Sequence, residues 1–141
     1  MAHLLIEYSA NLRHQLDMQP LVDALHAAAL ATGIFPIGGL RTRAYASECY
    51  RIADGDASNA FVHVSVRVGH GRDLETRRRA CEQIFEAACA QLDTAFARVP
   101  LGLSVEMQEI DPQLSFKKNN LHDYVKSRRA ASSSSAGSAA A

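Results

Sequence analysis

Alternating apolar and polar positions predict four β-strands along this chain. The clearest alternation runs from Phe61 to Val68, where every second residue from Val62 on is a valine and polar side chains stand between. Weaker alternation predicts strands over residues 3–8, 40–45 and 101–108. Because successive side chains on a strand point to opposite faces, each of these strands has one apolar face to bury.

Two further stretches carry apolar residues at helical spacing. The first predicts a helix that begins at Met18, after the capping residue Asp17, and ends at Gly33, a residue suited to left-handed backbone. The second predicts a longer helix that begins after Asp73 and ends before Pro100. Its expected apolar face consists of Leu74, Cys81, Ile84, Phe85, Ala88, Leu92 and Phe96.

The predicted order is strand, helix, strand, twice over. This order is typical of two β-α-β units in an α+β domain, an α/β sandwich. Right-handed crossovers place both helices on one face of a four-stranded sheet. The other face then has no cover within the chain, so we expect an oligomer in which another copy of the chain covers it.

The end of the domain is expected at residue 126. All the predicted strands and helices fall within residues 1–126. From Ser127 onward the chain consists mostly of serine and alanine. Such a composition lacks the apolar side chains that a core needs, so we expect residues 127–141 to form a flexible tail.

Length and charge narrow the function classes. With 141 residues the chain is expected to form one domain, and its 15 Lys and Arg residues balance its 15 Asp and Glu residues. A net charge of zero argues against a nucleic-acid or anionic-membrane partner. No apolar run approaches the ~20 residues that span a bilayer, and the first residues do not resemble a secretory signal. The three cysteines form no CxxC pair, which favours a reduced, cytoplasmic protein.

Short motifs of known chemistry are missing from the sequence. It has no phosphate-binding loop, no serine-nucleophile motif, and no histidine spacing that suits a metal, so no metal site is expected. Arg41 follows a pair of glycines and Arg72 ends a glycine-containing turn. Each guanidinium can bind a carboxylate through two parallel hydrogen bonds. Composition alone favours two solvated surface arginines, so both alternatives are open here.

Several short motifs, in order and without large gaps, cover residues 3–126. They are His3–Ser9 with Asn11, Ala31–Pro36, Gly39–Arg43, Ala53–Gly55, Ala60–His63, Gly69–Arg72 and Phe116–His122. Together they resemble the 5-carboxymethyl-2-hydroxymuconate Δ-isomerase family of the tautomerase superfamily.

The resemblance implies a fold, an assembly and an activity. Members of this family have two β-α-β units in one chain and assemble as homotrimers. The implied activity is the isomerisation, without a cofactor, of a small polycarboxylate in the breakdown of homoprotocatechuate and 4-hydroxyphenylacetate. The product is an unsaturated 5-oxo tricarboxylate. The family uses an amino-terminal proline as the general base, and by family position Arg41 and Arg72 bind the substrate and stabilise its developing negative charge.

The chain departs from the family pattern at one position, because Ala2 stands where the family has proline. If Met1 is removed, a primary amine replaces the secondary amine of the family. If Met1 stays, the nitrogen of Ala2 is an amide and cannot act as a base. Two alternatives therefore stay open: an isomerase with impaired activity, or a divergent, non-catalytic trimer that binds small dicarboxylates.

Overall fold

The computed structural model describes residues 1–138 of the chain and contains the four predicted strands and both predicted helices. Its elements are β1 (Ala2–Ser9), η1 (Ala10–His14), α1 (Met18–Ala31), η2 (Ile37–Gly39), β2 (Leu40–Ser47), β3 (Ala60–Gly69), α2 (Leu74–Phe96), β4 (Leu101–Ile110) and α3 (Leu121–Ser138). Here η denotes a short 3₁₀ helix.

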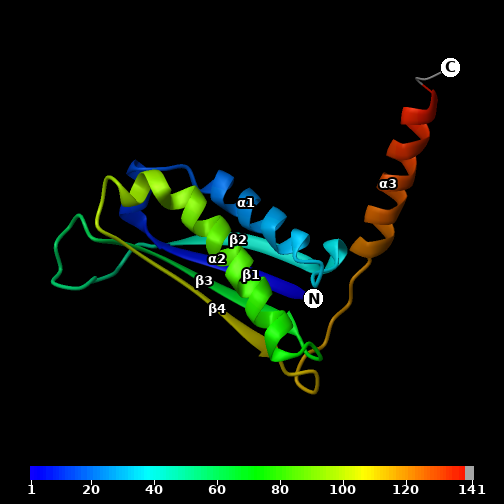
Figure 1. Cartoon of the computed structure of the whole chain (residues 1–141), viewed down its shortest axis with the longest axis horizontal. Coiled ribbons are helices and arrows are strands. Elements are labelled where there is room, and N and C mark those ends of the chain that lie inside the picture. Colours follow the sequence, from blue (N-terminus) through cyan, green and yellow to red (C-terminus); the bar gives the residue numbers. More distant parts are fainter. Residues whose placement is uncertain (139–141) are drawn as a thin grey trace.

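The strands form one mixed sheet in the order β2-β1-β3-β4. β1 pairs parallel with β2, and β3 pairs parallel with β4, whereas the central pair β1 and β3 is antiparallel. Each parallel pair is joined through a helix, so the chain consists of two β-α-β units. Figure 1 shows α1 and α2 side by side on one face of the sheet, as the sequence predicts.

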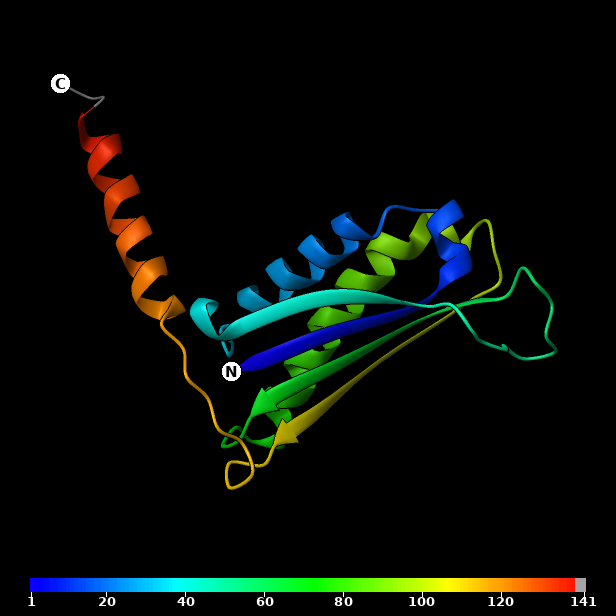
Figure 2. The same cartoon turned by 180° about the vertical axis from the view of Figure 1, so that it is seen from behind.

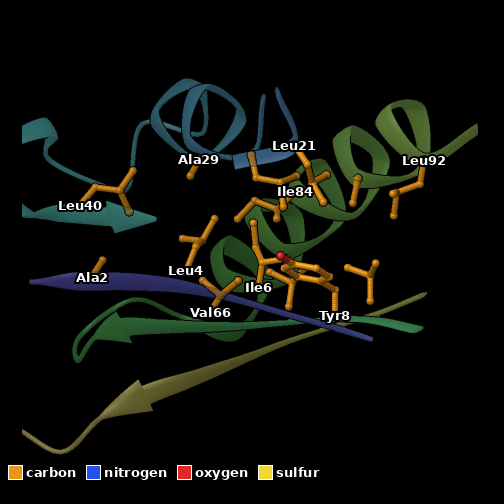
Figure 3. Close-up of a cluster of buried hydrophobic side chains, with 14 of the residues drawn as sticks. Ala2, Leu4, Ile6, Tyr8, Leu21, Ala29, Leu40, Val66, Ile84 and Leu92 are labelled. Atoms are coloured by element: carbon orange, nitrogen blue, oxygen red, sulfur yellow. The ribbon is translucent and has the colours of Figure 1, made fainter. Parts of the chain in front are cut away.

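The core lies between this sheet face and the two helices (Figure 3). Every second residue of β1 from Ala2 to Tyr8 is buried there, as are the valines of β3. The helices contribute side chains spaced four residues apart: Leu21, Leu25 and Ala29 from α1, and Ile84, Ala88 and Leu92 from α2. The core is therefore formed by every second residue of the central strands and by every fourth residue of the two helices.

The predicted apolar face of α2 is partly wrong. Leu74, Phe85 and Phe96 are 72%, 43% and 44% exposed. The residues of α2 that are buried are Ala80, Ile84, Ala88, Leu92 and Ala95. Neighbouring residues in a helix point about 100° apart, so the side that buries Ile84 turns Phe85 toward solvent. The alanines let α2 approach its neighbours closely, which hydrophobicity alone does not indicate.

The opposite face of the sheet is turned away from α1 and α2 (Figure 2). Arg43 Nη1 lies 3.2 Å from His3 Nδ1 on this face, and the Ser47 hydroxyl donates to Glu7 at 2.6 Å. His63 Nδ1 lies 2.7 Å from Ser104 Oγ. These contacts pair polar groups between neighbouring strands, but no helix among residues 1–138 covers them.

The expected tail differs from the structure, because α3 continues as a helix through Ser138. Residues 139–141 of the tail lie outside the described part of the chain. Alanine has the highest helix propensity, which accounts for a helix in this stretch. Yet α3 projects away from the sheet in both views, its main contacts are with η2, and residues 127–137 are all exposed (Figures 1 and 2). The predicted boundary between the domain (residues 1–126) and the tail (residues 127–141) stays a prediction.

Deleting residues 127–141 is expected to leave the stability of the domain unchanged. Exposed residues outside the core typically contribute within about 0.5 kcal/mol, which shifts the melting temperature of a domain of this size by only about 2 °C. Differential scanning calorimetry of the full and shortened chains measures this directly. A loss of many degrees would show that the end of α3 packs against something that stabilises the fold.

Candidate active site

A cavity of about 430 Å³ opens at the beginning of β1. Its size lies within the usual range for small-molecule sites. Its walls come from the chain start, the segment after α1, the end of β3 with the following turn, and the segment after β4. They are lined by Met1, Ala2, Ile34, Phe35, Pro36, Val68, Gly69, His70, Arg72, Ile110, Pro112, Ser115 and Lys117.

The sheet topology explains why these segments meet. Because β1 and β3 are antiparallel, the beginning of β1 lies beside the end of β3, with His3 paired to Arg67. β4 runs parallel to β3 and ends at the same edge, where Gly69 pairs with Ile110. The turn after β3 and the segment after β4 are thereby brought to the chain start.

Arg72 reaches the cavity from the turn between β3 and α2, where two backbone carbonyls hold it. Its Nη1 donates to the Gly69 oxygen at 3.0 Å and its Nη2 to the Ile34 oxygen at 2.6 Å. Gly71 has a φ of +108°, a left-handed conformation that favours glycine. Glu109, near the end of β4, accepts from the Gly71 nitrogen at 3.3 Å. The turn is therefore tied to the sheet on one side and to the segment after α1 on the other.

Arg41 lies close to the chain start but does not line the cavity. It stands on β2 in register with His3, and its Nη1 donates to the Gly39 oxygen at 3.2 Å. Its positive charge lowers the pKa of the Met1 amine, as does that of Arg72. The two predicted arginines thus converge on the amine, one from the cavity wall and one from β2.

The α-amine at the chain start lies in a surrounding that favours its neutral form. Partial burial lowers the pKa of the Met1 amine most, because burial disfavours the charged form. The nearby charge of Lys117 lowers this pKa further. Arg41 and Arg72 add to the shift. A free amine is what general-base catalysis requires.

The α-amine is expected to titrate below the range of about 7.7–8.0 that is usual for this group. The reason is that burial and the three neighbouring cations all disfavour the ammonium form. The ¹⁵N chemical shift of the amine, followed against pH, gives the midpoint directly. A midpoint at or above the usual range would contradict the surroundings described for this nitrogen.

Ala2 is buried, and its side chain belongs to the hydrophobic core. Its nitrogen is part of the peptide bond with Met1 and is not basic while Met1 is present. The first residue of the mature chain therefore decides which nitrogen faces the cavity as an amine.

Lys117 is the cavity residue that pattern reasoning missed. It lies in an irregular stretch after β4, where no periodicity indicates which way a side chain points. The stretch is held to η2: Asn119 Nδ2 donates to the Gly38 oxygen at 2.8 Å, and a Cβ atom on Gly38 would lie 2.6 Å from His122 Nδ1. Asn119 Oδ1 also accepts from the Leu121 nitrogen at 2.9 Å, which forms a local turn. The signal for Lys117 was its place in the Phe116–His122 motif.

Residues 1–138 contain no group of three or more His, Cys, Asp or Glu side chains placed to bind a metal ion. Within the same residues, every helix is too short or too polar to cross a membrane.

Comparison with known families decides the relationship. The model of the 5-carboxymethyl-2-hydroxymuconate isomerase family matches residues 2–125. The chain belongs to this family. It is 36% identical over 126 residues to the 5-carboxymethyl-2-hydroxymuconate Delta-isomerase of Escherichia coli, an alignment that covers 89% of this chain and 100% of that protein.

Solved structures of the same family have the same fold. A 5-carboxymethyl-2-hydroxymuconate delta-isomerase superposes with a TM-score of 0.83 at 33% identity, covering 89% of this chain and 93% of that one. The isomerase from Deinococcus radiodurans R1 gives 0.81 at 35% identity, covering 88% and 93%. Distant tautomerase-superfamily structures, such as a member of the cis-3-chloroacrylic acid dehalogenase family (14% identity, TM-score 0.60), share the fold alone. The predicted family and α+β fold are confirmed.

Proposed function

We propose that this chain isomerises 5-carboxymethyl-2-hydroxymuconate, without a cofactor, in the breakdown of homoprotocatechuate and 4-hydroxyphenylacetate in the cytoplasm. The observation that carries the proposal is the cavity itself. In a member of the 5-carboxymethyl-2-hydroxymuconate isomerase family, it joins the chain's amine to Arg72 and lies beside Arg41. An acidic substrate needs such cations, and a proton transfer needs such a base.

The substrate is a conjugated dienol, and its isomerisation moves one proton. The hydroxyl at C2 loses its proton and becomes a ketone, C5 gains a proton, and a single C3=C4 double bond replaces the C2=C3 and C4=C5 double bonds. The free amine at the chain start takes up a proton and gives one back. Negative charge spreads over the dienolate between these events, and the guanidinium groups of Arg41 and Arg72 stabilise it. The guanidinium of Arg72 also binds a substrate carboxylate.

The second candidate is a divergent trimer that binds small dicarboxylates and does not catalyse. Ala2 favours it, because a primary amine stands in place of the family's secondary amine once Met1 is removed. If Met1 is retained, the family's base position is an amide nitrogen. Calorimetric titration with a dicarboxylate, run beside the assay, separates the candidates. Binding that Arg41→Ala or Arg72→Ala abolishes, without any turnover, would establish the second.

An absorbance assay of ketonisation tests the first candidate, with the intact mass of the chain measured on the same sample. Turnover of 5-carboxymethyl-2-hydroxymuconate by this chain, at a rate that Ala2→Pro increases, is the expected result. If neither protein converts this triacid or the simpler diacid 2-hydroxymuconate, the enzymatic proposal is wrong.

We further propose that the active form is a homotrimer. In its support, the sheet face opposite α1 and α2 carries half-buried His3 and Leu5 with no cover among residues 1–138. A fused 4-OT structure that shares the fold, with 19% identity and a TM-score of 0.55, is described as a symmetric trimer. Light scattering on the eluting protein should give the mass of three 15.3 kDa chains. The mass of a single chain would contradict the proposal.

A further inference from the structure

Two cations line the cavity and a third lies beside it, whereas the family resemblance singles out only two of the three. Arg72 and Lys117 line the cavity, and Arg41 acts on the same amine from β2. Lys117 comes from the segment between β4 and α3, far in sequence from both arginines. It lies near the amine as well, because its charge lowers the pKa of that group.

Among residues 1–138, these three cations have no carboxylate partner. The ion pairs among residues 1–138 involve Arg13, Arg77, Arg78, Arg79, His63 and His70, and none involves Arg41, Arg72 or Lys117. Like charges held close together repel one another unless an anion lies between them. Three unpaired cations at one cavity therefore fit a ligand that brings several negative charges.

The proposed substrate has three carboxylates, two at the ends of the muconate chain and one on its carboxymethyl branch. Resting on the proposed function, we propose that Lys117 binds the carboxylate of the carboxymethyl branch. Lys117 thereby makes the site prefer a branched tricarboxylate over an unbranched dicarboxylate. An ammonium group suits this part, because it is a point charge on a flexible stem and can follow a branch that rotates.

Lys117 is presented by a segment that is fixed at its far side. The hydrogen bond from Asn119 to Gly38 and the close packing of His122 on Gly38 anchor the chain two to five residues beyond Lys117. The neighbouring Lys118 has the same charge and exposure but does not line the cavity. The two lysines therefore form a matched pair for experiment: both change the net charge equally, and only one faces the site.

Calorimetric titration of the full-length protein at physiological ionic strength tests the proposal. The ligands are pentane-1,2,5-tricarboxylate, which has the carbon skeleton of the branched acid, and adipate, which lacks the branch; both are saturated and cannot be turned over. A charge-assisted hydrogen bond predicts that the wild-type protein binds the triacid about 10-fold more tightly or better. Lys117→Gln should reduce that preference to within about 2-fold while changing adipate binding little. Lys118→Gln should keep the wild-type preference, and Lys117→Arg should keep most of it.

The ratio of the affinities for the triacid and for adipate, compared among the variants, tests the proposal. An undiminished preference in Lys117→Gln overturns the proposal, and so does an equal loss in Lys117→Gln and Lys118→Gln, which reports net charge alone. A wild-type protein that binds both acids equally also overturns it, but leaves the proposed function standing. A wild-type protein that binds neither acid contradicts the proposed function itself.

Discussion

Ala2→Pro is expected to increase kcat for ketonisation by about 10- to 100-fold, a part of the roughly 10²- to 10⁴-fold that a well-placed general base contributes. Once Met1 is removed, proline presents a secondary amine whose ring fixes the direction of the nitrogen lone pair. The primary amine of Ala2 rotates freely, and it can also form an imine with the keto product. Ala2 is the first residue of β1, a position in a strand that accepts proline.

Ala2→Ser is the matched control, since it keeps a primary amine and a small residue after Met1. Its kcat should equal that of the unmodified chain. The intact mass of all three proteins must show that Met1 is absent, because only then is the nitrogen of residue 2 an amine. A proline variant no faster than the serine variant, with Met1 absent from both, would show that a fixed secondary amine is not what this site lacks.

Arg72→Gln is expected to lower kcat/KM by about 100- to 1000-fold, the usual cost of removing a group that stabilises negative charge in the transition state. Glutamine is shorter than arginine and uncharged. Arg72→Lys should recover only part of the loss, because an ammonium cannot make two parallel hydrogen bonds to one carboxylate. The measurement is steady-state kinetics over a range of substrate concentrations.

Arg72 also supports the fold, since it donates to the carbonyl oxygens of Gly69 and Ile34. The melting temperature of each variant therefore has to be measured beside its kinetics. Arg79→Gln is a suitable control, because Arg79 is an exposed arginine of α2 that does not line the cavity. If the Arg72→Gln protein is folded and has the same kcat/KM as the Arg79→Gln protein, Arg72 does not take part in catalysis.

The sequence predicted best those features that depend on residues close together in the chain. Asp17 caps α1 by accepting from the Gln19 nitrogen at 3.1 Å, and Asp73 caps α2 by accepting from the Thr76 nitrogen at 2.7 Å. Gly33 has a φ of +77° where α1 was predicted to end. Strand alternation predicted which side of β1 and β3 is buried. Each of these depends on local conformation, which a short stretch of sequence encodes.

Features that depend on distant partners were not predictable in the same way. The exposure of Leu74 and Phe96 depends on how α2 is rotated against α1 and the sheet, which hydrophobicity alone does not determine. Lys117 lies in a stretch without regular secondary structure, so no periodicity indicates where its side chain points. It reaches the cavity because its segment is held to Gly38. Arg41 and Arg72 were indistinguishable from surface arginines by composition, and the family resemblance singled them out.

The attachment of the segment after β4 to η2 has a consequence for the growing chain. The amino end of a chain emerges first during synthesis, at roughly 5–20 residues per second. A chain that has emerged only through β4 holds both parallel strand pairs, with Arg72 already at the edge of the sheet. The wall that carries Lys117 is still missing at that stage. Newly made protein therefore acquires its complete ligand chamber only after residues 117–122 have emerged and His122 has docked against Gly38.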